Sequence, residues 1–287
     1  MKAKAECLIR LFRQFSHFHD TRYGLFVHDG SQERNARNKI FRPQCRPDYN
    51  TVKKYIRYLR ESPENCIYLD RAFQNIYFKL CIGNILTQLT ISMSYMFHRT
   101  ISKTLLLSFY DTTNVITMEG MLSFIKVSNL VLANFKCTNV QNMSHMFHHV
   151  VILCYCNFSS LTCDKATTVS FMFAYMIYTG EMDLSNMNPS RIEDTSYMFR
   201  GCQATKVILS SFDTRQTSSL RNMFSVMKPF ALILGVYTSF DPRRNLVNEH
   251  MFEATQIYYI RITSYGMLVA VLNEPHFVSQ LMTDFHE

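Results

Sequence analysis

The stretch Asn142-Met143-Ser144-His145-Met146-Phe147 decides the fold, because its final pair recurs along the chain at a nearly fixed spacing. The seven pairs are Met96-Phe97, Met121-Leu122, Met146-Phe147, Met172-Phe173, Met198-Phe199, Met223-Phe224 and Met251-Phe252. Successive pairs stand 25, 25, 26, 26, 25 and 28 residues apart. A fixed period of about 20 to 50 residues is typical of a solenoid, in which each repeat forms one coil. We expect these fourteen residues to form the core of the repeats.

Residues inside the repeats follow variants of the pattern Val-x-x-Met-x-x-Met-Phe, as at Val115, Met118 and Met121. The upstream Met occurs in the first three repeats and is replaced by Val169, Thr195, Leu220 and Asn248 in the later ones. Positions i, i+3, i+6 and i+7 lie on one face of a helix. We therefore expect a short helix or helical turn in each coil, with its methionines turned inward. Polar residues such as Asp213 and Thr214 precede this segment, and they can cap free N–H groups at its start.

A short alternating apolar pair comes earlier in each repeat. The pairs are Leu80/Ile82, Leu105/Leu107, Leu130/Leu132, Cys156/Phe158, Met182/Leu184, Val207/Leu209 and Leu232/Leu234, of which the fourth is the best alignment of an irregular unit. Period-two alternation over so short a run predicts a β-strand with one buried face. Each of about seven coils then has one short strand and one short helix, and the predicted fold is an α/β repeat solenoid.

The repeats divide the chain into three parts. Residues 1–78 form a basic helical leader and N-terminal cap, residues 79–252 form the solenoid, and residues 253–287 form a C-terminal cap. A solenoid needs such caps because the core of its first and last coils is otherwise exposed.

Two amphipathic helices are expected in the leader and one at the C-terminus. The first covers residues 1–18; the second begins after Asp48 or Asn50, buries the stripe Val52, Tyr55, Ile56 and Leu59, and ends at Ser62-Pro63. Past the repeats, residues 257–260 and 267–272 read as closing strands, and Pro275 opens a terminal helix.

The net charge of +8 is concentrated in the leader. Residues 1–78 carry 15 Lys and Arg against 8 Asp and Glu, whereas the remainder carries 15 against 14. A nearly neutral array argues against tracking nucleic acid along its length, which needs a basic stripe. The second helix carries a possible basic binding face, formed by Lys53, Lys54, Arg57 and Arg60; the alternative is an ordinary solvated face.

No secretory signal is evident, because Arg10 and Arg13 interrupt the apolar residues near the start. No apolar run approaches the about 20 residues of a membrane helix. Nine cysteines are too few for a disulfide scaffold in a chain of this length, and a reducing compartment suits them better. We therefore expect a soluble protein, with an intracellular location favoured.

The repeats resemble those of the BspA-type leucine-rich repeat surface proteins, including the mycoplasma lipoprotein repeat. That repeat runs approximately L-D-L-S-N-F-D-T-S-N-V-T-N-M-S-Y-M-F-x-G-C. Residues 182–187 (MDLSNM) and 207–214 (VILSSFDT) match its first half, and residues 139–147 (NVQNMSHMF) match its second half. The resemblance covers about residues 79–252. It implies a leucine-rich-repeat-like solenoid used in adhesion and protein binding and not in catalysis; this chain lacks the export signal and lipobox cysteine of the family.

Patterns of catalysis and cofactor binding are missing from the sequence. The eight glycines fit neither a dinucleotide fingerprint nor a P-loop, and no nucleophile elbow or His-Glu-x-x-His occurs. A metal cluster is conceivable from His145, His148, His149, Cys154, Cys156 and Cys163, but no Cys-x-x-Cys spacing supports it. We expect these histidines on a variable face and these cysteines as core fillers. No catalytic residue, metal, cofactor or small-molecule substrate is predicted.

Two functions from different classes remain. The first is a non-catalytic protein-interaction module that presents the solenoid surface to a protein partner. The alternative is a binder of nucleic acid or of an anionic membrane through residues 1–78, with the array as scaffold.

Overall fold

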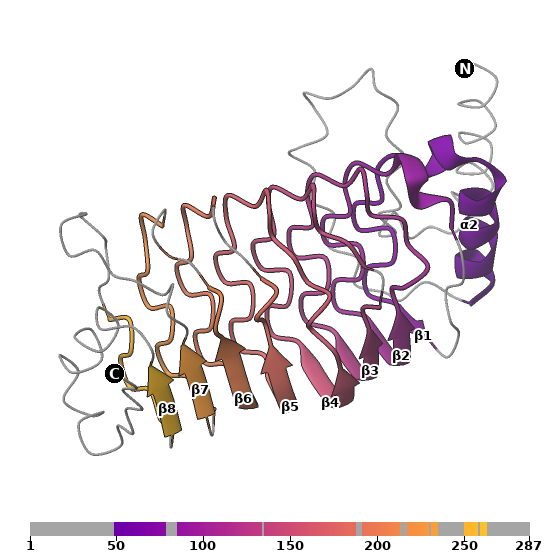
Figure 1. The fold of residues 1–287 in the computed structure, drawn as a ribbon. Helices are drawn as coiled ribbons and strands as arrows, with labels where there is room; N and C mark the ends of the chain where they lie inside the picture. The colour runs from indigo at the N-terminus through magenta and orange to yellow at the C-terminus, as the bar shows by residue number, and fades with distance from the viewer. Residues whose placement is uncertain are drawn as a thin grey trace.

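A computed structural model of the chain describes residues 49–78, 85–133, 135–187, 191–212, 214, 217–229, 231–234, 250–257 and 259–262. These residues form a parallel β-solenoid with little helix, in which α2 is the one α-helix of the described part (Figure 1). The helices expected over residues 1–18 and after Pro275, and the strand expected over 267–272, lie outside the described residues.

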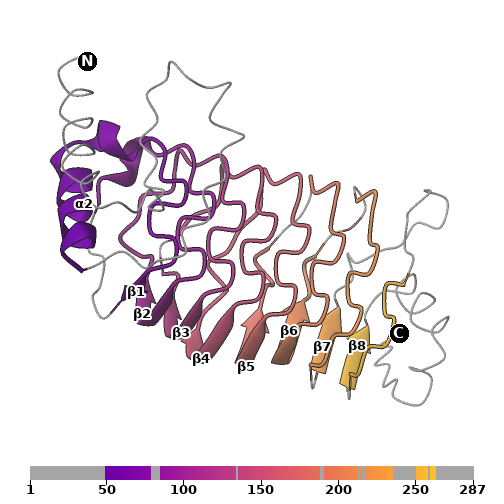
Figure 2. The same cartoon turned by 180° about the vertical axis from the view of Figure 1, so that it is seen from behind.

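Eight strands form one sheet, and their order in the sheet is their order in the sequence. They are β1 (Tyr77–Phe78), β2 (Ile101–Leu106), β3 (Lys126–Val131), β4 (Val151–Cys156), β5 (Ile177–Asp183), β6 (Gln203–Leu209), β7 (Ala231–Leu234) and β8 (Tyr259–Ile262). All neighbouring pairs are parallel, so each step across the sheet is one coil of the chain. Figures 1 and 2 show the strands side by side along one face of the stack.

A second ladder runs along the stack through single polar or aromatic residues. Its members are Tyr68, Ser92, Thr117, Asn142, Thr168, Asp194 and Ser219, each joined to the next by a parallel bridge. Coils joined by this ladder are therefore hydrogen-bonded to each other at the bridge as well as along the strands. Repeated pairing at fixed positions explains why the sequence period is so regular.

The expected short helix in each coil is wrong, and β-turns take its place. In the coil of Met96, the N–H of Met96 donates to the carbonyl of Met93 at 3.2 Å, which closes a four-residue turn. Tyr95 and Arg99 have φ angles of 55° and 56°. An L-residue in this left-handed region cannot continue a right-handed helix. The same two left-handed positions recur in successive coils, once just before the Met and once three residues after it.

Hydrogen bonds between coils replace those that a helix would make within a coil. The N–H of Phe97 donates to the carbonyl of Met121 at 2.8 Å, and the N–H of Phe147 donates to Met172 at 2.8 Å. The N–H of Phe199 makes the same bond to the coil after it. Because these donors point along the stack, they are not free to form the i to i−4 bonds of an α-helix.

The fourteen paired Met, Phe and Leu residues of the seven repeats are all buried. Their phenylalanines form a nearly parallel stack along the core, with ring centroids 5.2 Å apart for Phe147 and Phe173 and 5.3 Å apart for Phe173 and Phe199. Leu122 interrupts this stack between Phe97 and Phe147. The stack shows that equivalent positions of successive coils lie above one another.

One coil precedes the array as it was read from the sequence. Phe73 is fully buried and stacks on Phe97 at 5.5 Å, and Tyr68 forms the first bridge of the ladder. The sequence signal was weak because Ala72, 24 residues before Met96, stands where the other repeats have Met. The stack therefore begins inside the segment assigned to the leader and not at residue 79.

Helix α2 (Tyr49–Glu61) is confirmed close to its expected place, and it ends before Pro63 as expected. Its apolar stripe packs on the first coil: Leu59 is fully buried, and the ring of Tyr55 lies 5.9 Å from that of Phe73. Figure 1 shows α2 at the end of the stack beside β1. Two short 3₁₀ helices, η2 (Pro63–Cys66) and η3 (Thr87–Leu89), are the other helical segments of the described part.

Strand β4 carries an extra residue, which accounts for one of the two 26-residue intervals. Val127 of β3 pairs with Ile152, whereas Asn129 pairs with Tyr155. Ser128 of β3 thus lies opposite two residues of β4, Leu153 and Cys154, which is a β-bulge. After the bulge Cys156 pairs in register with β3, and this supports the alignment of Cys156/Phe158 in the irregular fourth repeat.

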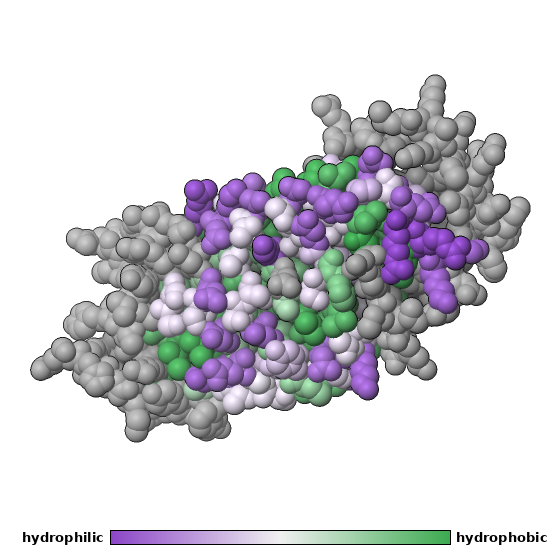
Figure 3. Space-filling model, turned by 45° about the vertical axis from the view of Figure 1, so that its right-hand side comes forward, coloured by the Kyte–Doolittle hydropathy of each residue, from purple (hydrophilic) through white to green (hydrophobic). Residues whose placement is uncertain are grey.

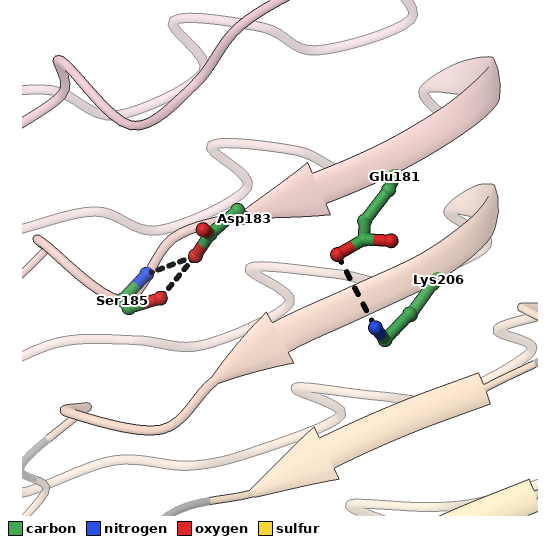
Figure 4. A network of polar contacts seen from close by, with 4 residues as sticks. All are labelled: Glu181, Asp183, Ser185 and Lys206. Atoms are coloured by element: carbon green, nitrogen blue, oxygen red, sulfur yellow. Dashed lines mark hydrogen bonds and ion pairs between the residues drawn. The ribbon is translucent and has the colours of Figure 1, made fainter.

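Strand β5 carries the second bulge. Tyr178 pairs with Ala204 of β6, whereas Glu181 pairs with Lys206. Figure 4 shows that the Lys206 ammonium then lies against the Glu181 carboxylate, at 3.2 Å. An exposed ion pair of this kind contributes little stability, so the bulge and its neighbours must be held by other contacts.

Polar contacts of Ser185 and Tyr178 stabilise this part of the sheet. The N–H of Ser185 donates to the carboxylate of Asp183 at 3.0 Å just after β5, and the Ser185 hydroxyl lies against the same oxygen (Figure 4). The Tyr178 hydroxyl lies between β4 and β5, where it accepts from the N–H of Cys156 at 3.2 Å and donates to its carbonyl at 3.0 Å. Since paired β4 and β5 residues end at Ile152 and Tyr178, this side chain substitutes for strand pairing.

Within the described residues, no helix has the length and apolar character needed to cross a membrane.

Candidate interaction surface

The turns around the Met-Phe pairs carry the most distinctive surface of the described molecule. Met and Phe point into the core, and three other positions complete each turn: the residue before Met and the second and third residues after Met. Most of these residues are exposed or half-buried, whereas Gly120, Ser123, Ala174, Gly201, Asn222 and Ser225 are buried. We call the surface formed by these positions the turn face. In seven coils it comprises Arg71, Gln74, Asn75, Tyr95, His98, Arg99, Gly120, Ser123, Phe124, His145, His148, His149, Phe171, Ala174, Tyr175, Tyr197, Arg200, Gly201, Asn222, Ser225 and Val226.

The residues before Met form a first column of stacked rings. His145 stacks on Phe171 at 4.8 Å, and Phe171 stacks on Tyr197 at 4.5 Å, with planes within 10°. All three have positive φ angles, between 55° and 59°. The left-handed backbone places each ring directly over the equivalent residue of the next coil.

The third residues after Met form a second column beside the first. The ring of Phe124 stacks on His149 at 4.8 Å, and His149 stacks on Tyr175 at 4.8 Å. The guanidinium carbon of Arg99 lies 5.7 Å from the Phe124 ring, which extends the column with a cation–π contact. This column also has a left-handed backbone at each position, as at Phe124 with φ of 59°.

Two glycines mark places where a ring of the preceding coil lies over the backbone. A Cβ on Gly120 would stand 2.3 Å from the Tyr95 ring, and a Cβ on Gly201 would stand 2.6 Å from the Tyr175 ring. Their φ angles of 56° and 63° also favour glycine. The columns thus combine a ring in one coil with either a ring or a glycine in the next.

Three histidines of one coil lie together in the middle of the turn face. The Nδ1 atoms of His145 and His148 are 2.9 Å apart, and the ring of His148 stacks on His149 at 4.5 Å. Burial, together with the smaller effect of the charges on His149, His145 and His98, lowers the pKa of His148 to about 4. Burial also lowers the pKa of His145 and of His149. The group is therefore neutral at pH 7.

His98 of an earlier coil has a defined tautomer. Its Nδ1 lies 2.6 Å from the Ser123 hydroxyl, which itself donates to the carbonyl of Gly120 at 2.7 Å. Because the hydroxyl hydrogen is used there, Nδ1 of His98 must carry the hydrogen that the Ser123 oxygen accepts. Burial has the largest effect on the pKa of His98, and the charges of Arg99 and Arg71 add to it. Together they lower that pKa to about 4.

Polar contacts fix the ends of the columns. The guanidinium of Arg200 donates to the Tyr175 hydroxyl at 2.8 Å, to Asn222 at 2.8 Å and to the Ser225 hydroxyl at 2.9 Å. Its carbon lies 5.7 Å from the Tyr197 ring. These bonds span three coils, so they order the side chains of the turn face before any partner arrives.

The histidines and cysteines that a metal would need do not converge. His145, His148 and His149 lie on the turn face, Cys154 is exposed on β4, and Cys156 and Cys163 are buried in the core. Burial raises the pKa of both core thiols, which makes them poorer ligands. The part of the chain that the structure describes holds no group of three or more His, Cys, Asp or Glu side chains suited to a metal ion.

The four residues of the possible basic face of α2 are all exposed. Lys53, Lys54 and Arg57 lie on the side of the helix away from the buried Leu59, whereas Arg60 lies beside the buried face, where its charge acts on the Tyr110 hydroxyl. In Figure 3 the N-terminal end of the stack is strongly hydrophilic, whereas hydrophobic residues farther along reach the surface in separate patches. The basic residues and the turn face are thus two different surfaces.

Sequence reasoning missed the two aromatic columns. Their signal is visible once the repeats are aligned on Met: the preceding residue is Tyr95, Gly120, His145, Phe171, Tyr197, Asn222 and His250 in turn. A variable position is normally interpreted as solvated surface, and only the left-handed backbone brings its members into contact.

The stacked coils, each closed by the same turn, define a repeat protein of the parallel β-solenoid class. The chain belongs to the family described as Mycoplasma protein of unknown function, DUF285, which matches residues 67–177 and again residues 167–271. The first match begins within the additional coil that contains Phe73. No curated protein and no solved structure matches the chain.

Proposed function

We propose that this protein is a non-catalytic protein-interaction module and that the turn face is its binding surface. The observation that supports this most strongly is the choice of residues at left-handed positions. Phe171, Tyr175 and Tyr197 stand where glycine or asparagine would fit with less strain. A left-handed L-residue costs roughly 1–2 kcal/mol, and such strain concentrated on one surface favours a functional role for it.

The composition of the turn face suits a protein partner. Tyr, Phe and Arg are enriched at protein interfaces, and aromatic rings dominate binding energy there. The rings are held by stacking and, at Tyr175, by the bond from Arg200. Since little side-chain freedom remains to be lost, binding to this surface has a small entropic cost.

The repetition of the turn face supports an extended shape for the proposed partner. Rings at equivalent positions recur once per coil at about the 4.8 Å spacing of parallel strands. An extended protein segment lying along the stack can therefore contact several coils through the same kind of side chain. The resemblance to BspA-type repeats points to the same class of function, protein binding and adhesion.

The test compares two surface variants in capture from native lysate, with bound proteins identified by mass spectrometry. One variant carries Phe171→Asn and Tyr197→Asn, which remove two rings while keeping residues that tolerate the left-handed backbone. The matched control carries Leu153→Thr and Tyr155→Thr, at exposed apolar residues on β4. We expect the control to retain the partners of the wild type and the turn-face variant to lose them; equal capture by both variants would contradict the assignment of the surface.

A second candidate function is binding of nucleic acid or an anionic membrane through the leader, favoured by the four exposed basic residues of α2. Its test is retention on DNA and on anionic vesicles as salt is raised. Replacing Lys53, Lys54, Arg57 and Arg60 with Gln should abolish retention and its salt dependence. Absence of retention by the wild type at low salt eliminates this function.

A further inference from the structure

We propose that the turn face is acid-sensitive: protonation of the cluster formed by His98, His145, His148 and His149 opens the stacked columns and thereby switches the binding surface off. The effect on binding rests on the function proposed above. The structural switch itself concerns the protein alone and follows from the geometry of the cluster.

The contact between His145 and His148 tolerates one added proton but not two. Their Nδ1 atoms are 2.9 Å apart, so one of them carries the shared hydrogen and the other offers a lone pair. A single added proton leaves that arrangement intact, because the neutral ring still accepts. When both rings are charged, two N–H groups point at each other and the contact must break.

Stacking adds repulsion within the same coil. His148 and His149 are 4.5 Å apart with planes within 17°, and His145 and His148 are 5.1 Å apart with planes within 17°. Neutral imidazoles pack well in this arrangement, whereas two imidazolium rings face to face repel. Acidification thus converts a favourable stack into an unfavourable one.

Charged neighbours on the adjacent coils do not remove this repulsion. Glu119 on the preceding coil favours a proton on His145, but its carboxylate already accepts the hydroxyl hydrogen of Tyr95 at 2.7 Å. Arg71 and Arg99 oppose a charge on His98.

On the following coil the cluster meets mainly aromatic rings. His145 lies against Phe171, and His149 lies against Tyr175, whose hydroxyl accepts from Arg200. These neighbours supply no carboxylate that could stabilise a charged ring.

The backbone links the histidines to the stack of coils. His145 and His149 occupy the two left-handed positions of their turn, with φ of 58° and 54°. Their N–H groups donate to the carbonyls of Ser170 and Ala174 in the next coil, both at 2.9 Å. The stacked rings hold the side chains of His145 and His149 in place. If the rings move apart, the hydrogen bonds from these two residues to the next coil also weaken.

The direction of the pH effect follows from the lowered pKa of each histidine. Below pH about 6.5 the unfolded chain takes up protons that the folded protein does not, so acid favours unfolding. The loss of stability starts near pH 6.5, the ordinary histidine pKa. It is complete once the pH has fallen below the pKa in the folded protein, which is about 4 for His98 and His148. Each such histidine changes the unfolding constant by up to about tenfold per pH unit, and the two together by up to about a hundredfold.

The experiment follows the full-length protein by NMR of its histidine ring protons and by hydrogen exchange between pH 7.5 and 3.5. We expect His98 and His148 to titrate near pH 4 and His145 and His149 to titrate below the ordinary value. Turn amides 145–149 should lose protection in acid, after correction for intrinsic exchange, before those of β6. Ordinary titration near pH 6.5, or unchanged protection at pH 3.5, would overturn the proposal.

A pair of variants isolates the cluster. In wild type, His98 and His148 together increase the unfolding constant by up to about a hundredfold for each pH unit of acidification. The double variant His98→Gln and His148→Gln should lose this contribution, so its unfolding constant should depend less on pH. The matched control is His250→Asn, at the same turn position near the end of the stack, where the side chain is 60% exposed and lies 3.6 Å from Glu253. The control should keep the wild-type pH dependence; equal behaviour of the two variants excludes the switch.

Binding gives a separate readout. Partner captured by the wild type at pH 7.5 should be released near pH 4, whereas the double variant should lose a smaller share of the partner that it captures itself at pH 7.5. If no turn-face partner exists, the proposed function fails while the histidine titration stands. If the histidines titrate normally, the switch fails while capture at pH 7.5 stands.

Discussion

Gly180 lies directly beneath the ring of Tyr178: a Cβ on residue 180 would stand 2.3 Å from both Cζ and the hydroxyl of that ring. The missing side chain lets Tyr178 turn back across the bulge of β5 and reach the backbone of Cys156. Space, and not an unusual backbone angle, makes glycine necessary here. One small residue therefore allows the sheet to pass an irregular coil.

We predict that Gly180→Ala destabilises the protein by about 1–3 kcal/mol, because the added methyl group overlaps the Tyr178 ring. Urea unfolding of the purified protein measures this loss. In a Tyr178→Val background the ring is gone, and the same substitution should have almost no effect. An equal loss in both backgrounds would show that the ring is not the cause.

Tyr178→Phe should lower stability by about 1–3 kcal/mol, since the buried N–H and carbonyl of Cys156 lose their hydrogen-bond partner. Tyr155→Phe on β4 provides the control, because Tyr155 is 52% exposed and its change should stay within about 0.5 kcal/mol. Thermal melts of both variants make the comparison. Similar melting points for the two would refute the bridging role of the hydroxyl.

Val226→Asn should stabilise the protein by about 1 kcal/mol. Val226 is β-branched and has a φ of 56°, a conformation that asparagine adopts more readily. The N–H bond to the carbonyl of Glu253 at 2.8 Å is kept. The control is Val131→Asn in strand β3, which should lower stability. A lower urea midpoint for Val226→Asn would contradict the strain that we infer.

The core stack should tolerate leucine much better than alanine. Phe173→Ala should cost about 3–5 kcal/mol through the cavity it leaves, whereas Phe173→Leu should cost less than half of that. The reason is that Leu122 occupies the equivalent position and is fully buried in its own coil. Equilibrium unfolding of the two variants measures both losses of stability. Equal losses would mean that the stability depends on stacking of the Phe173 ring and not on the volume of the side chain.

Much of the fold could be read from local patterns. Apolar pairs such as Val207 and Leu209 predicted strands, and both are buried in β6. The stripe that includes Ile56 and Leu59 predicted helix α2. These predictions succeed because burial with period two or 3.6 is a property of consecutive residues, which the sequence displays directly.

The turn face could not be read in this way. The spacing of Met118 and Met121 fits a helical face as well as it fits a series of turns, because both place the two side chains on the buried side. What distinguishes them is the acceptor of each N–H group, and Met121 and Phe97 are joined only when the next coil is in place.

By itself the sequence determined the period, the buried residues, the strands and helix α2, because each depends on neighbours along the chain. Only the tertiary structure decided that the coils close in left-handed turns and that His145, Phe171 and Tyr197 stack into a column. Those features arise from hydrogen bonds and ring contacts between coils about 25 residues apart. No local pattern encodes contacts at that separation.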